Sequence, residues 1–181
     1  MLLSYEECKK QYGSQYQIDK AVESGMLFQL EKGIYSTKKR ESDIAVISMK
    51  YPSVIFTMNS AFYFYGLTDD IPDLYYVVTK RGARKITDSR VVQKFENSEE
   101  ALILGAEETD YEGTKILMYN RERMLLELIR HKNQLPFDYY KEILNNYRNI
   151  VHELNVQNIT DYAEKLPKNK MIMETLRLEV F

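Results

Sequence analysis

The sequence of 181 residues predicts an α/β (α+β) fold, with a small N-terminal winged helix-turn-helix followed by a mixed domain of antiparallel sheet and helices. Three observations predict this. Two short helical patterns meet at Gly13, a hairpin pattern surrounds Gly33, and beyond residue 40 short β-branched runs give way to long helical stripes. We therefore divide the chain into a winged-helix domain, 1–40, and an α+β domain with a helical C-terminus, 41–181.

Residues 4–11 fit a short helix capped by Ser4, and a second helix follows the break at Gly13 with Ser14 as its cap. Three apolar residues repeat at helical spacing in this second helix: Ile18, Ala21 and Val22. Residues 26–30 and 34–36 then read as two strands joined by a turn in which Gly33 takes a positive φ. This order is that of a winged helix-turn-helix, whose second helix enters a major groove about 12 Å wide.

The following residues alternate between helix and strand patterns. We expect a helix at 41–51, a strand at 54–56 and a helix capped by Asn59 that runs to Tyr65. Further strands, expected to pair in antiparallel fashion, are predicted at 74–79, 91–95, 102–106 and 114–118. From Arg121 onward the pattern is helical to the end of the chain, and we expect Arg121 and Arg123 to bridge to the acidic stretch at 107–110.

Composition narrows the class of protein. Apolar residues make up 44% and charged residues 29%, and no run approaches the ~18 apolar residues of a membrane span. One cysteine and an acidic N-terminus without a basic leader favour a cytoplasmic protein without a membrane segment. With only two histidines besides that cysteine, we expect neither a metal nor a cofactor.

The charge of −2 is unevenly distributed. Residues 1–40 carry seven Lys or Arg against five Asp or Glu, so the predicted winged helix is mildly basic. Its candidate DNA contacts are the cap and polar face of the second helix, the hairpin tip and the basic run that follows: Ser14, Gln15, Tyr16, Gln17, Lys20, Lys32, Lys38, Lys39 and Arg40. The alternative is that these residues are merely solvated and that the module contacts protein.

A second basic cluster contains Lys80, Arg81, Arg84 and Lys85. It could touch a phosphate backbone or an acidic partner. Because the cluster follows a strand and contains a glycine, the favoured interpretation is a solvated loop.

Catalytic interpretations are weaker. Gly13-Ser14 near Asp19 is faintly typical of a nucleotidyltransferase, but no Asp-x-Asp pair accompanies it to hold two metal ions. The sole Glu-x-Lys, Glu7-Cys8-Lys9, lacks the upstream acid of a nuclease, and a pair between Cys8 and a histidine stays open. We expect no enzyme; a cryptic nuclease or nucleotidyltransferase is the least favoured alternative.

Several blocks in order resemble the AbiEi antitoxins of type IV toxin–antitoxin systems. They are "GMLFQLEKGIYS", "TMNSAFYFYGLTDDIP" followed by "YYVVTKRGARK", and "YNRERMLLELIR". The blocks lie between about residues 12 and 131. Tyr65 stands where the family has a histidine, and Met124 and Glu127 stand where it has threonine and aspartate.

The resemblance implies a repressor that binds an inverted repeat in double-stranded DNA upstream of its own operon. It also implies an antitoxin, with a role in phage defence, that counteracts a nucleotidyltransferase-like toxin without forming a stable complex with it. We expect a monomer or weak dimer that binds DNA cooperatively. The rival hypothesis is a protein-interaction module of the same fold that no longer binds DNA.

Overall fold

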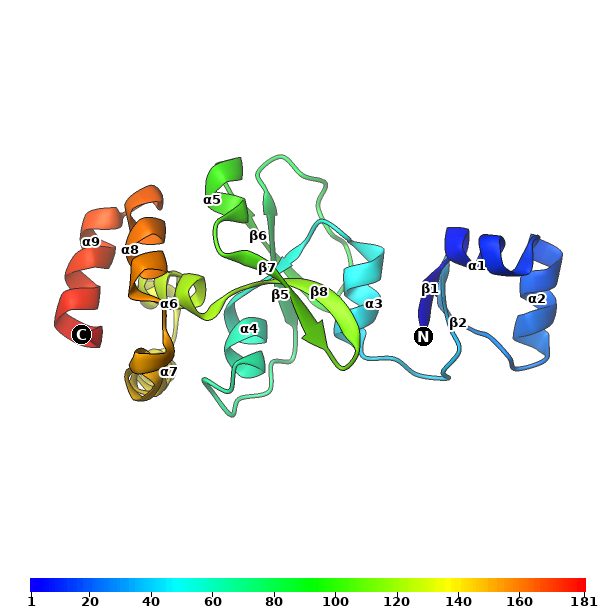
Figure 1. Cartoon of the computed structure of the whole chain (residues 1–181), viewed down its shortest axis with the longest axis horizontal. Coiled ribbons are helices and arrows are strands. Elements are labelled where there is room, and N and C mark those ends of the chain that lie inside the picture. Colours follow the sequence, from blue (N-terminus) through cyan, green and yellow to red (C-terminus); the bar gives the residue numbers. More distant parts are fainter. The chain divides into compact units, whose positions relative to one another are not determined.

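Two short helices flank Gly13 at the start of the chain (Figure 1), as the sequence predicted. Helix α1 (Tyr5–Tyr12) begins with a capping box. The Ser4 hydroxyl accepts a hydrogen bond from the Glu7 amide at 3.3 Å, and the Glu7 carboxylate accepts one from the Ser4 amide at 2.7 Å. Helix α2 (Gln15–Glu23) begins after Ser14 and ends at Ser24. The two caps therefore fix both helix starts.

A three-stranded antiparallel sheet follows, in the order β1-β3-β2. Strands β2 (Phe28–Glu31) and β3 (Ile34–Ser36) form the expected hairpin, and Gly33 in its turn has a φ of 79°. Strand β1 (Leu2–Ser4) was not predicted; it pairs with β3, with Leu3 opposite Tyr35. Helix α3 (Asp43–Lys50) packs against β1 and β3. A third strand thus extends the winged helix-turn-helix.

The structure is a computed structural model that describes residues 1–181, and the chain divides into two compact units. The N-terminal unit comprises Met1–Ser53 and 110–116, and the C-terminal unit comprises Val54–Thr109 and Leu117–Phe181. The sequence-based boundary near residue 40 left α3 in the second domain. Because α3 packs on the small sheet, the N-terminal unit instead continues to Ser53.

The larger sheet has the strand order β6-β5-β4-β8-β7. Its strands are β4 (Ile55–Phe56), β5 (Tyr75–Lys80), β6 (Val91–Glu96), β7 (Ala106–Tyr111) and β8 (Thr114–Tyr119). Strand β4 is antiparallel to β5, as expected, but β5 with β6 and β4 with β8 are parallel pairs. The sheet is therefore mixed, and the prediction of uniformly antiparallel strands was wrong.

Two local predictions were also wrong in this unit. Residues predicted as a strand at 102–106 instead end helix α5 (Glu99–Ile103) and begin β7. The Ser98 hydroxyl caps α5 by accepting from the Ala101 amide at 3.0 Å, and such a side-chain bond favours helix over strand. Helix α4 (Met58–Phe64) starts after Thr57 rather than at Asn59. Its first residue, Met58, has a left-handed φ of 47°.

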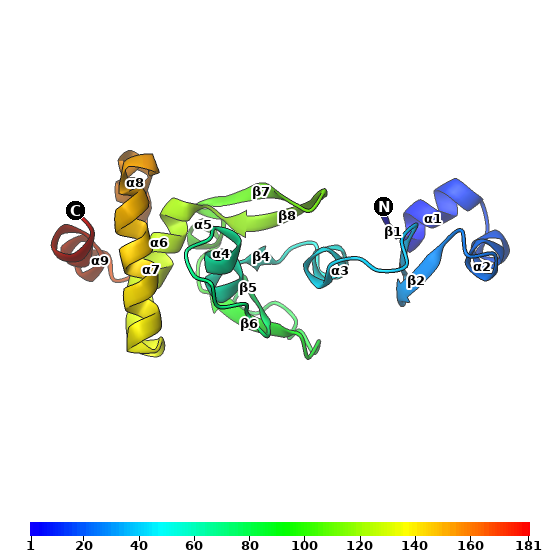
Figure 2. The same ribbon diagram turned by 90° about the horizontal axis from the view of Figure 1, so that it is seen from below.

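The C-terminal helices gather beside the sheet (Figure 2). They are α6 (Arg121–Arg130), α7 (Phe137–Ile150), α8 (Val156–Lys165) and α9 (Asn169–Thr175), with short 3₁₀ turns at Lys132–Gln134 and Val151–Glu153 and a π turn at Leu176–Val180. Helix α6 packs against α7, α8 and α9. The predicted apolar stripe of α6 is buried: Met124, Leu125, Leu128 and Ile129.

A buried arginine fastens α6 to the chain before β7. Arg123 is fully buried, and its guanidinium donates to the carbonyls of Ala101 at 2.7 Å and Leu104 at 2.9 Å. The expected bridge to the acidic stretch at 107–110 is therefore wrong for Arg123. Arg121 does not provide that bridge either, because it pairs with Glu153 at 2.8 Å.

The buried carboxylate of Glu127 joins three cationic or basic side chains. Arg123 donates to it at 2.9 Å, Arg130 at 2.5 Å, and His131 Nε2 lies at 3.2 Å. Arg130 also donates to Glu96 at 3.1 Å. Burial alone would raise the pKa of Glu127, but the hydrogen bond with His131 and the charges of Arg123 and Arg130 outweigh it, so the pKa lies well below its usual value.

Glu127→Gln is expected to lower the free energy of unfolding by about 3 kcal/mol at pH 7, because it removes one of the two carboxylates that Arg123 and Arg130 share and leaves only Glu96 to neutralise them. A depressed pKa stabilises the fold above the unfolded-state value near 4.5 and loses this effect as the pH falls toward the folded-state pKa. The difference between wild type and variant, measured by urea unfolding, should therefore narrow below pH 4.5.

Glu164→Gln makes the same chemical change at an exposed site on α8 and serves as the control. A wild-type advantage over Glu127→Gln that stayed constant from pH 7 to pH 3 would contradict the assigned ion pairs.

Candidate nucleic-acid interface

A small apolar core holds α2 in place within the N-terminal unit. Ile18 and Ala21, on one side of the helix, are buried. The core they join consists of Leu3, Cys8, Ile18, Ala21, Leu27 and Tyr35, with Tyr5, Tyr12 and Val22 packed against it. Because this side of α2 is fixed against α1 and the sheet, the remaining polar side chains face solvent.

The predicted contact residues of α2 lie on that solvent-facing side. Gln15, Tyr16, Gln17 and Lys20 are all exposed, and the Tyr16 side chain is 63% accessible. The Lys20 ammonium lies 5.1 Å from the Tyr16 ring centroid, a cation–π contact that presents charge and ring together. The Gln15 amide donates to Asp19 at 2.7 Å, so one of its two N–H donors is occupied. The side-chain amide of Gln17 has its N–H donors and its oxygen acceptor both available for a partner.

The N-terminal end of α2 is suited to an anion. The Ser14 hydroxyl accepts from the Gln17 amide at 3.4 Å, so Ser14 serves as the expected cap. Unpaired amides in a first helical turn carry a partial positive charge that favours a phosphate. Ser14 is exposed, which leaves this end open to solvent.

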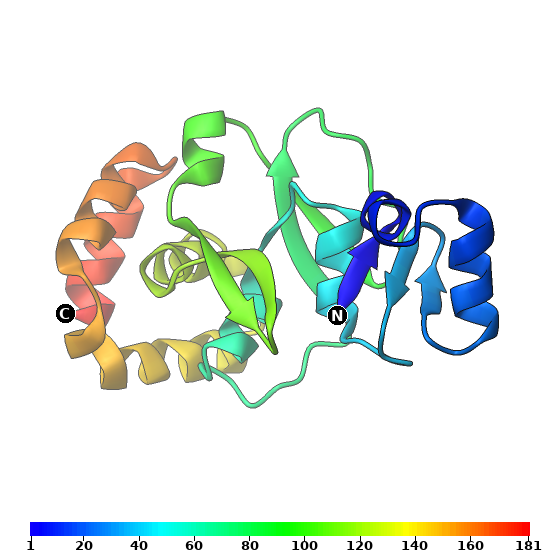
Figure 3. The same cartoon turned by 45° about the vertical axis from the view of Figure 1, so that its right-hand side comes forward.

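The β2–β3 turn of the wing places Lys32 toward the end of the N-terminal unit at which α2 begins. The nine residues of α2 and the four of β2 both span about 13 Å, and β2 runs back in the opposite direction (Figure 3). Lys32, in the turn after β2, is exposed. Its neighbour Glu31 is neutralised by Lys50 at 2.7 Å, a pair that sequence reasoning missed because the partners lie nineteen positions apart.

The basic run after β3 lies at the other end of the small sheet. Ser36 ends β3 opposite the first residue of β2, so Lys38, Lys39 and Arg40 follow the strand end remote from the Lys32 turn. All three are exposed. The pKa of Glu41 is lowered chiefly by a hydrogen bond from Ser36 and, to a smaller extent, by the N-terminal amino group and the charge of Lys38. The structure therefore gathers the helix start with the wing turn and separates both from this run.

The second basic cluster belongs to the C-terminal unit. Lys80 pairs with Glu99 at 2.6 Å, and Arg81 donates to Asn97 at 2.7 Å. Arg84 and Lys85 are exposed in the loop that follows β5. Two of the four cations in this cluster, Lys80 and Arg81, thus have local partners, in keeping with a solvated loop.

The residues that invited catalytic interpretations have structural roles. Glu7 belongs to the α1 cap, and the hydrogen bond from the Ser4 amide is the main cause of its lowered pKa. Cys8 is fully buried in the small core. No group of three or more His, Cys, Asp or Glu side chains is placed to hold a metal ion. No helix combines the length and the apolar character that crossing a membrane requires.

A pair of substitutions on α2 separates packing from the exposed face. Ile18→Ala, in the core, is expected to lower the unfolding free energy of the N-terminal unit by about 2–5 kcal/mol. Tyr16→Ala, on the exposed face, should change it by no more than about 0.5 kcal/mol. Amide hydrogen exchange of α1 and α2 measures both, and a large loss of protection in Tyr16→Ala would contradict its exposed placement.

The fold is similar to that of a solved structure, the RV2827C protein from Mycobacterium tuberculosis. The match has a TM-score of 0.62 at 14% sequence identity and covers 98% of this chain and 71% of that chain. No family model matches the sequence, and no curated protein does. The likeness therefore concerns the α/β fold, with its antiparallel small sheet and mixed larger sheet.

Proposed function

We propose that this protein is a DNA-binding transcriptional autorepressor and a non-enzymatic antitoxin of a type IV toxin–antitoxin operon. The sequence blocks that resemble the AbiEi antitoxins suggest both roles. The observation that carries the DNA-binding role is the polar, exposed face of α2 at the same end of the N-terminal unit as the Lys32 turn. This arrangement suits a helix in the major groove and a wing on the adjacent backbone.

The chemistry of the exposed residues allows both base reading and phosphate contact. Gln17 can pair bidentately with adenine, and Lys20 can reach guanine or a phosphate. Lys32 and the open start of α2 supply further phosphate contacts. A single module of this size gives limited specificity, so two copies on an inverted repeat are expected. The run Lys38–Arg40, at the other end of the small sheet, would contact the backbone separately.

Binding to the promoter DNA of the chain's own operon tests the repressor role. Lys20→Ala and Lys32→Ala are each expected to weaken binding and to reduce the slope of log K against log salt by about one per lost phosphate contact. Fluorescence anisotropy with labelled duplex at several salt concentrations measures both quantities.

Lys170→Ala is the matched control because it removes one exposed cation from α9, which belongs to neither basic cluster. Its affinity and its salt slope should equal those of wild type. If the salt slopes of Lys20→Ala and Lys32→Ala equalled that of wild type, neither lysine would belong to the DNA interface.

One observation favours the rival role of a protein-interaction module. Two acidic residues, Asp19 and Glu23, are exposed on α2, and Asp19 occupies the amide of Gln15. Carboxylates close to a phosphate backbone weaken binding. If the wild-type chain fails to shift its own promoter DNA at low salt, the interaction module becomes the better assignment.

The antitoxin role is testable in cells. Co-expression of the chain should restore growth to cells that express the nucleotidyltransferase-like toxin that this proposal places in the same operon. Size-exclusion chromatography of the two purified proteins should show separate peaks, because no stable complex is expected. Growth arrest that persists despite expression of the folded chain would exclude the antitoxin role without affecting the DNA-binding test.

A further inference from the structure

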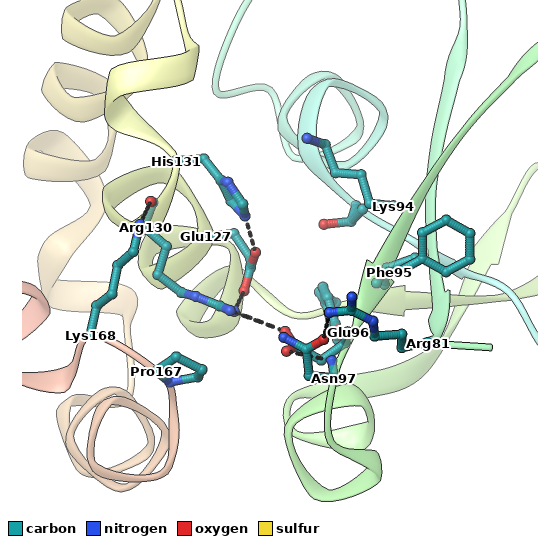
Figure 4. A pocket seen from close by; sticks show the side chains of 13 residues that line it. Arg81, Lys94, Phe95, Glu96, Asn97, Glu127, Arg130, His131, Pro167 and Lys168 are labelled. Carbon is teal, nitrogen blue, oxygen red and sulfur yellow. Dashed lines mark hydrogen bonds and ion pairs between the residues drawn. The ribbon is translucent and has the colours of Figure 1, made fainter. Parts of the chain in front are cut away.

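The C-terminal unit contains a cavity of about 590 Å³ that the DNA-binding proposal does not use. It lies between the β5–β6 side of the sheet and the end of α6 (Figure 4). Arg130 and His131 come from α6 and its end, whereas Lys94 and Glu96 come from alternate positions of β6. Pro167 and Lys168, which precede α9, complete one side. Residues distant in sequence therefore converge on one hollow.

The carboxylates of this cavity are already neutralised. Arg130 binds both Glu96 and Glu127, and the buried Arg123 lies 3.6 Å from Glu96 and 2.9 Å from Glu127. These four side chains form a closed set of two positive and two negative charges. The remaining charged residues that line the cavity are cations, so they set its net charge.

Three lining cations lack a carboxylate partner. Arg81 donates only to the Asn97 side chain, and the Lys168 ammonium donates to the Arg130 carbonyl at 3.4 Å. Lys94 is half-buried, and its ammonium has no hydrogen-bond or ion-pair partner. Holding an unpaired ammonium partly away from water is unfavourable, and an anion bound in the cavity would offset that cost. The cavity is therefore an electropositive site.

Its position in the sheet is one that ligands favour. Strands β5 and β6 are parallel, and Arg81 and Asn97 directly follow their carboxyl ends. In open α/β sheets, ligands bind in crevices outside the carboxyl ends of parallel strands. Arg81 and Asn97 are thus placed where the fold tends to carry a binding site.

Two of the three non-glycine residues with a left-handed φ, and both buried polar atoms without a partner, line one or other of the two hollows that share Lys94. This residue also lines a second hollow of about 770 Å³, together with Met58 and Tyr139. Met58 and Lys168 have left-handed φ values of 47° and 67°. The only buried side-chain polar atoms without a hydrogen-bond partner are His131 Nδ1 and Tyr139 Oη, whose residues line the two hollows. Strain and unpaired groups of this kind gather at functional sites.

We propose that this cavity binds a phosphorylated small molecule about the size of a mononucleotide. The cations Arg81, Lys94 and Lys168 attract the phosphate, which matches their charge and donor capacity. A volume of about 590 Å³ is typical of a small-molecule site and far exceeds that of a bare phosphate. Apolar surface from Val78, Phe95 and Pro167 accommodates the organic part. The inference does not depend on DNA binding or on antitoxin activity.

Isothermal titration calorimetry of the full chain at low salt tests the assignment, with AMP, GMP, ribose 5-phosphate, inorganic phosphate and adenosine as probes. At least one of the three organic phosphates should bind saturably and more tightly than inorganic phosphate or adenosine. Lys94→Ala should weaken that binding about tenfold or more, since it removes a charged hydrogen-bond donor, and Lys94→Arg should retain most of it.

Lys85→Ala is the matched control: it removes one exposed cation from the loop after β5, outside the cavity, and should leave the affinity unchanged. Thermal unfolding of each variant verifies that it is folded. The proposal is overturned if no organic phosphate binds saturably, if inorganic phosphate or adenosine binds as tightly, or if Lys85→Ala weakens binding as much as Lys94→Ala.

Discussion

Burial of Ile18 and Ala21 determines which side of α2 the solvent meets. A helix of nine residues is too short to be stable alone in water, so its packing against α1, Leu27 and Tyr35 holds it in helical form. The same packing leaves Tyr16, Gln17 and Lys20 outside the core. The packing that forms the small core therefore also orients the candidate interface toward solvent, and no other contact is needed to orient it.

The C-terminal unit relies on a different interaction, a group of largely buried and mutually paired charges. Arg123 ties α6 to the residues that precede β7, and this region has no spare room. A side chain at Gly105 would place its Cβ 2.6 Å from that of Arg123. Because Arg130 is held by Glu96 and Glu127, it cannot turn toward a ligand without losing its ion pairs with both carboxylates. Anion binding in the neighbouring cavity then falls to Lys94, Lys168 and Arg81.

Local signals in the sequence were sufficient for the helices and the wing. Ser4 and Ser14 cap helices that begin at the next residue, and Gly33 lies in the turn between two adjacent strands. Because these caps and this turn involve residues that are close in sequence, they could be predicted from sequence alone. Strand β1 has only three residues and exists through its pairing with β3, which no local pattern encodes. The parallel pairing of β5 with β6 is likewise a contact between distant segments.

The exposed candidate contacts on α2 could be named in advance because an amphipathic helix displays its polar residues at regular spacing. The cavity could not. Its lining residues come from separate segments, among them β6, the end of α6 and the turn before α9, and no local pattern in the sequence brings these segments together. Arg123 illustrates the same limit: an arginine at the start of a helix suggests a surface ion pair, and only the tertiary fold buries it.

The single cysteine of the chain gives the N-terminal unit a built-in reporter. Cys8 is fully buried in the core that supports α2, and burial raises the pKa of its thiol. A thiol reagent can reach it only when that core opens. Labelling with such a reagent therefore reports the opening of the core around α2, in the intact chain and without any engineered probe.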